Sequence, residues 1–275
     1  MQILGSTVKT IARRPFIILF FGAAALIYCI MNSYNPAVAI LSGLGKITGG
    51  NMFESVISLL QVLIEPKFIM IVVLAILGIS AAAAVGAGLV LSGGLNVIDA
   101  AVDGRPSEKG EFLSGLRKFF FRVSGISFKV FFLSSVFTLF LMVAAVPAII
   151  ATSTAMTEKP DYMLAAVFID ILTAGVFFFG LMFFRAYLVF WFPAAYDGFS
   201  KPYIAGKRFA YENFWSIVGR FLAFDVVFAL YLLVKSVIKS SIVLFAYDWV
   251  FLTLFPSMFV TYVFTYYKVK GHTSS

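Results

Sequence analysis

Two aspartates occupy nearly identical pentapeptides, AAVDG at residues 100–104 and AAYDG at residues 194–198. An Asp-Gly pair favours a turn, because glycine takes the left-handed conformation that closes a helix. The pattern therefore predicts that Asp103 and Asp197 each end a helix. The other interpretation is that the two carboxylates converge on a cation or a partner, since a duplicated unit would relate them by its axis.

A third carboxylate, Asp170, lies eight residues into the apolar segment 162–192. With a helical rise of about 1.5 Å per residue, it would lie at roughly 12 Å depth in a membrane span. Ionisable residues inside such spans are functional candidates by default. Asp170 is therefore either an ion or proton site on a transport pathway or a packing residue that is hydrogen-bonded to a neighbouring hydroxyl.

Basic residues gather in two segments, LSGLRKFFFR at 113–122 and AGKRFAYENFWSIVGR at 205–220. On one helix through 207–220, Arg208 and Glu212 can pair on a polar face. The opposite face is apolar and consists of Ala210, Tyr211, Phe214, Ile217 and Val218. Such an amphipathic helix lies in the membrane interface, with its aromatic rings at headgroup level. We therefore expect anionic lipid headgroups to bind five cations: Arg117, Lys118, Arg122, Lys207 and Arg208.

Catalytic chemistry finds little support in the residue types present. The chain has one histidine, His272, and one cysteine, Cys29, so the usual zinc ligand sets and a Cys-His pair are excluded. The glycine-rich stretch GAGLVLSGG lacks the Lys-Ser/Thr pair that a phosphate-binding loop needs. We expect no catalytic residue, no metal site and no cofactor, and hence a protein that is not an enzyme.

The elements that carry these residues are predicted to be membrane-spanning helices. Hydrophobic residues make up 61% of the chain, whereas soluble domains are about half apolar. Long stretches almost free of charge recur, and they lack the alternation of barrel strands. The expected fold is an all-α, polytopic membrane bundle, a single domain over residues 1–275 with an outer loop at 35–65. Its spans are about six: 15–34, 68–97, 128–152, 162–192, 221–238 and 242–267.

The net charge of +8 is explained by topology. Most Lys and Arg residues precede the first, third and fifth spans or follow the sixth. The loops on the other side of the membrane, which follow the first, third and fifth spans, contain only five: Lys46, Lys67, Lys159, Lys235 and Lys239. Because positively charged loops stay in the cytoplasm, both termini are predicted to be cytoplasmic, in a multi-pass protein of the cell membrane. Nucleic acid is not expected as a partner.

The two AAxDG turns belong to a longer correspondence at an offset of 94 residues. The same offset relates Pro66 to Pro160, Gly86 to Gly180, Phe120 to Phe214 and Gly125 to Gly219. This predicts an internal duplication, about 66–152 and 160–246, whose copies run in the same direction through the membrane. Parallel repeats of this kind occur in some transporters.

The succession of AAxDG, a basic polar segment, and then FFFRV or FWSIV resembles a group of prokaryotic six-helix membrane proteins of unknown function. The group includes the membrane domain attached to some glycerophosphodiester phosphodiesterases. The resemblance covers Phe68 to Val269 and implies a polytopic bundle of unassigned role. The phosphodiesterase activity of that family belongs to a soluble barrel that this chain lacks, so hydrolysis is not implied.

Two functions follow as expectations. The first is a non-catalytic membrane protein that organises lipids or accompanies a partner protein, with anionic lipids and a protein partner or a second copy of the chain as its contacts. The alternative is a small transporter or lipid-translocating protein whose pathway lies at the repeat interface and includes Asp170.

Overall fold

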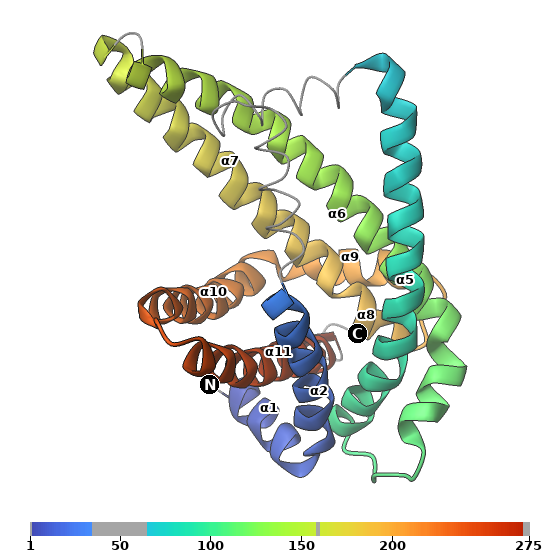
Figure 1. The fold of residues 1–275 in the computed structure, drawn as a ribbon. Coiled ribbons are helices and arrows are strands. Elements are labelled where there is room, and N and C mark those ends of the chain that lie inside the picture. The colour runs from blue at the N-terminus through green and yellow to red at the C-terminus, as the bar shows by residue number, and fades with distance from the viewer. Residues whose placement is uncertain (1, 35–64, 158–159, 272–275) are drawn as a thin grey trace. The chain divides into compact units, whose positions relative to one another are not determined.

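A computed structural model describes residues 2–34, 65–157 and 160–271 of the chain. The predicted outer loop therefore lies outside the described residues, except for Glu65, and so does His272. Helices are the only regular secondary structure in these described ranges (Figure 1). They are α1 (Gln2–Arg13), α2 (Phe16–Tyr34), α5 (Pro66–Val102), α6 (Glu111–Thr157), α7 (Met163–Val189), α8 (Trp191–Tyr196), α9 (Pro202–Glu212), α10 (Phe214–Val237) and α11 (Ser241–Gly271), with a single 3-10 turn at Pro160–Tyr162.

Five of the described spans are long and apolar enough to cross a membrane, or six if the bent pair α1 and α2 counts as one. This confirms the prediction of an all-α, polytopic membrane bundle. The chain turns by 84° between α1 and α2. The 47 residues of α6 extend over about 70 Å, more than twice the roughly 30 Å hydrocarbon core of a bilayer. The basic segment 113–122 is therefore the first part of the spanning helix itself.

The chain divides into two compact units. The first contains Met1–Tyr34, Val85–Ile126 and Arg185–Ser275, and the second contains 35–84 and 127–184. In the second unit, α6 and α7 run side by side, with the ring of Phe137 stacked on Phe184 at 4.5 Å between centroids. Gly180 leaves room for this ring, because a Cβ there would lie 3.1 Å from it.

In the first unit, α11 uses two different faces. One face packs aromatic rings on α10, where Phe224 meets Phe255, Phe259 and Tyr262. The other face carries the small polar residues Thr253, Ser257, Thr261 and Thr265, all buried. This second face packs on α2, whose buried residues include Gly22, Ala25 and Cys29. Small residues on both helices allow this close approach.

The predicted single helix through 207–220 is wrong at Asn213, where α9 ends and α10 begins. The side-chain amide and the backbone N–H of Asn213 both donate to the carbonyl of Phe209, at 3.1 Å each. Asparagine competes in this way with the regular helical hydrogen bonds. The predicted apolar face is divided as a result, since Ala210 and Ile217 are buried in the protein core whereas Tyr211 is exposed.

Candidate functional site

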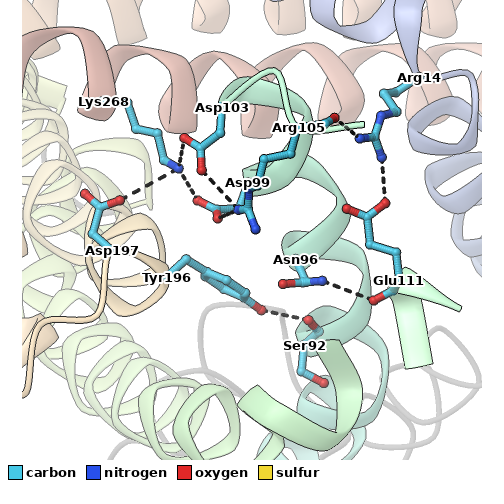
Figure 2. Close-up of polar contacts among 10 residues, drawn as sticks. All are labelled: Arg14, Ser92, Asn96, Asp99, Asp103, Arg105, Glu111, Tyr196, Asp197 and Lys268. Carbon is cyan, nitrogen blue, oxygen red and sulfur yellow. Dashed lines mark hydrogen bonds and ion pairs between the residues drawn. The ribbon is translucent and has the colours of Figure 1, made fainter. Parts of the chain in front are cut away.

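A buried lysine at the end of α11 is the centre of the main polar cluster in the first unit. The Lys268 side chain is only 9% exposed. Its Nζ lies 2.6 Å from Asp99 Oδ1 and 3.8 Å from Asp197 Oδ1, and it also contacts Asp103 Oδ1. Figure 2 shows the ammonium between Asp197 on one side and Asp99 and Asp103 on the other. The three carboxylates thus surround a cation that belongs to the chain.

A second cation, Arg105, binds two of these three carboxylates from another direction. Arg105 donates to Asp99 Oδ2 at 2.5 Å and to Asp103 Oδ2 at 3.0 Å (Figure 2). Asp99 therefore receives Lys268 on one oxygen and Arg105 on the other, which suits a carboxylate that is almost fully buried. A buried charge is costly unless it is paired in this way.

The local sequence explains how the aspartates reach this position. Asp99 lies in the last turn of α5, and Asp103 directly follows the end of that helix. Because the two residues are four apart, their side chains project toward the same side. Gly104 has a φ of 71° and Gly198 a φ of 84°, so both AAxDG segments turn in the left-handed conformation directly after the aspartate. The N–H of Asp103 donates to the carbonyl of Asp99, and that of Asp197 to the carbonyl of Pro193. The two turns are closed alike, and both aspartates face Lys268.

Further hydrogen bonds connect this cluster to the beginnings of α2 and α6. Arg14 binds Glu111 at 2.6 Å and the carbonyl of Arg105 at 2.5 Å. Asn96 donates to the carbonyl of Glu111 at 3.1 Å, and the Tyr196 hydroxyl donates to the carbonyl of Ser92 at 2.8 Å (Figure 2). The C-terminal ends of α5, α8 and α11 therefore meet the N-terminal ends of α2 and α6 at one end of the first unit.

The five cations expected at lipid headgroups occupy two environments. Arg117, Lys118, Lys207 and Arg208 are exposed. In contrast, the guanidinium of Arg122 donates to the carbonyls of Ala195 and Phe199 at 2.8 Å each, and so holds the turn between α8 and α9 against α6.

The four exposed cations are presented differently on their two helices. Arg117 and Lys118 line an open hollow of about 500 Å³ together with Gly110, Leu113 and Ser114. Arg208 pairs with Glu212 at 2.8 Å, the pair predicted from the sequence. This hydrogen bond to Glu212 raises the pKa of the Arg208 guanidinium further above its usual range.

The carboxylate of Asp170 accepts a hydrogen bond from the Thr152 hydroxyl within the second unit, at 2.9 Å to Oδ2 and 3.1 Å to Oδ1. This is the neighbouring hydroxyl of the packing interpretation. The transport interpretation of Asp170 stays a prediction.

Two more pairs involve charges inside the spans of the first unit. Arg185 binds Asp225 through two hydrogen bonds of 2.6 and 2.7 Å between α7 and α10. Asp248 accepts from Lys235 at 2.7 Å and from Tyr231 at 2.6 Å. The sequence shows these charges but not their pairing.

The roles of Asp99 and Lys268 were not predicted at all, and the one available signal was that Asp99 precedes Asp103 by four residues.

The chemistry of the Lys268 cluster is that of a structural ion-pair network. Within the described ranges, no group of three or more His, Cys, Asp or Glu side chains is arranged to hold a metal ion.

Comparison with protein-family models, with curated proteins and with solved structures finds no match to this chain. The resemblance to the six-helix membrane proteins therefore stays an expectation from the sequence.

Proposed function

We propose that the chain is a non-catalytic protein of the cell membrane that organises anionic lipids at its cytoplasmic end, alone or beside a partner protein. The observation that carries this proposal is the position of the exposed cations. Arg122 joins the α6 segment that bears Arg117 and Lys118 to the turn that leads into α9, which bears Lys207 and Arg208. Four exposed cations are therefore gathered at one end of the first unit.

Exposed aromatic rings accompany these cations. Phe121 is 86% exposed beside the first pair, and Tyr211 and Trp215 are 75% and 79% exposed beside the second. Aromatic and basic side chains together are typical of the interface between a membrane and the cytoplasm, where each cation contributes about 1 kcal/mol to the binding of anionic lipid.

The meeting of helix ends supports an orientation with both termini in the cytoplasm. The start of α2 and the end of α11 both reach the polar cluster around Lys268, so these two helix ends lie at the same end of the first unit as the exposed cations. The similar closure of the two AAxDG turns supports the parallel repeat, because Gly104 and Gly198 correspond at the offset of 94 residues.

The test is the lipid composition retained by the purified protein. We would purify the protein from bilayers that contain equal amounts of an anionic and a zwitterionic phospholipid, and count the bound lipids by native mass spectrometry. Changing Arg117 and Lys118 to Gln, or Lys207 and Arg208 to Gln, should each lower the anionic preference by roughly 30-fold, since each double variant loses about 2 kcal/mol.

A matched control changes Lys67 and Lys239, two exposed cations of the opposite predicted loops, to Gln. This control should keep the full anionic preference. An unchanged preference in both test variants would refute the proposal.

A further inference from the structure

A cavity of about 570 Å³ opens between α1, α10 and α11 in the first unit. Its walls are partly apolar, with Ile3 and Leu4 from α1 and Ala223 and Phe224 from α10. Its polar lining consists of Gln2, Tyr262 and one cation, Arg220. A volume of this size is within the range of small-molecule sites in proteins, which are mostly apolar with a few polar groups that fix the ligand.

The guanidinium of Arg220 has an incomplete set of partners. It lies over the ring of Tyr266, with its carbon 4.3 Å from the ring centroid, and it faces the hydroxyl of Tyr262. Its Nη1 is buried without a hydrogen bond. The three helices that line the cavity carry only two acidic residues, Asp225 and Asp248. Asp225 is bound to Arg185, and Asp248 to Lys235 and Tyr231. Among the described residues, Arg220 therefore has no ion pair with a carboxylate. A charged donor that is buried is stabilised by an anion that accepts its hydrogen bond.

The position of Arg220 along α10 indicates which kind of anion could bind to it. Arg220 is the seventh residue of α10 and lies about 10 Å from the N-terminal end of this helix. That end directly follows α9, which bears Lys207 and Arg208. This depth is that of the headgroup layer at the edge of the hydrocarbon core. The amphipathic helix α1 makes an angle of 84° with α2, which follows it in the chain. Ile3 and Leu4 of α1 form an apolar wall of the cavity that contains Arg220.

From these observations we infer that the cavity binds one phospholipid from the cytoplasmic leaflet. Arg220 donates two hydrogen bonds to the lipid phosphate, a pairing for which the planar guanidinium is suited. The glycerol backbone occupies the cavity, and the acyl chains continue along the apolar wall of α1 and α10. The inference deepens the proposed lipid-binding function and rests on the cytoplasmic orientation given there, but it uses a residue outside the exposed cations.

The experiment measures binding of three probes to delipidated full-length protein: dioctanoyl phosphatidylglycerol, dioctanoylglycerol without the phosphate, and inorganic phosphate. Native mass spectrometry counts the bound probe, and the shift in thermal unfolding in detergent measures its effect. We expect the phospholipid to bind at one copy per chain and the other two probes to bind at least about tenfold more weakly.

Two variants address the residues themselves. Arg220→Gln should weaken phospholipid binding by about tenfold or more, whereas Arg13→Gln, which changes an exposed arginine of α1 outside the cavity, should leave it unchanged. Ala223→Trp keeps the guanidinium but fills the cavity, so it should also abolish binding and serves as the test if Arg220→Gln does not fold.

Several results would overturn the inference. Equal phospholipid binding by wild type and both cavity variants would show that the cavity is not the site. Equal binding of dioctanoylglycerol would exclude recognition of phosphate, and equal binding of inorganic phosphate would make the site one for a soluble anion. The double variants at the exposed cations should keep this single phospholipid, so failure of the proposed function and failure of this site give different results.

Discussion

Lys268 joins three carboxylates, those of Asp99, Asp103 and Asp197, at one end of the first unit. Changing Lys268 to Met would leave Asp99 buried with Arg105 as its remaining cation, and Asp197 without the contact to Nζ. Because removing one partner of a buried ion pair leaves an uncompensated charge, we expect the free energy of unfolding to fall by about 3 kcal/mol. Thermal or denaturant unfolding in detergent micelles measures this loss.

The control for this variant is Lys270→Met, which removes an exposed lysine two residues away and should change stability little. A double variant with Asp99→Asn and Lys268→Met should recover part of the loss, since it removes the uncompensated charge together with its partner. Equal stability of wild type and the Lys268 variant would contradict the role of the cluster.

Among the elements, the approach of α9 to α8 depends on a glycine. A Cβ on Gly206 would lie 2.7 Å from the carbonyl oxygen of Phe190 and 2.9 Å from Trp191 Cδ1. A backbone carbonyl cannot rotate away as a side chain can, so Gly206→Ala should destabilise the protein by about 1–3 kcal/mol. Gly219→Ala in α10 is the matched control, because a Cβ there has no neighbour within 4 Å.

That control should be equal to or more stable than wild type, since alanine favours a helix more than glycine does. The pair of variants is compared by thermal unfolding under identical conditions. If both glycine variants unfolded at the same temperature, the contact between α8 and α9 would not be the constraint that the structure indicates.

The elements could be predicted from the sequence to different degrees. The spans were predicted well, because a membrane requires long apolar stretches and the chain supplies them without interruption. The break at Asn213 was not predicted, since the apolar periodicity continues through it and only the bonds to Phe209 reveal it. The pairing of Lys268 with Asp99 joins residues far apart in the chain, and no local pattern encodes such a contact.

For the molecule as a whole, the orientation in the membrane can be tested by cysteine labelling. In a Cys29→Ala background, Lys109→Cys lies in the turn between α5 and α6, and Lys239→Cys in the turn between α10 and α11. A membrane-impermeant maleimide added to intact cells should label only the Lys239 variant, because the proposed orientation places the α5–α6 turn, which lies next to the cationic segment of α6, in the cytoplasm. The Lys109 variant should react after the membrane is opened, and the reverse pattern would invert the topology.

The contacts of α11 also determine the order in which the first unit can assemble during synthesis. Ribosomes make the N-terminal part of a chain first, so α2 enters the membrane long before its packing partner α11 exists. Asp99 and Asp103 are made almost together with Arg105, which can pair with both carboxylates but balances only one of their two charges while Lys268 is still untranslated. The face of α2 that packs on α11 is therefore covered only when synthesis is nearly complete, and Lys268 then adds its charge to the carboxylates of Asp99 and Asp103.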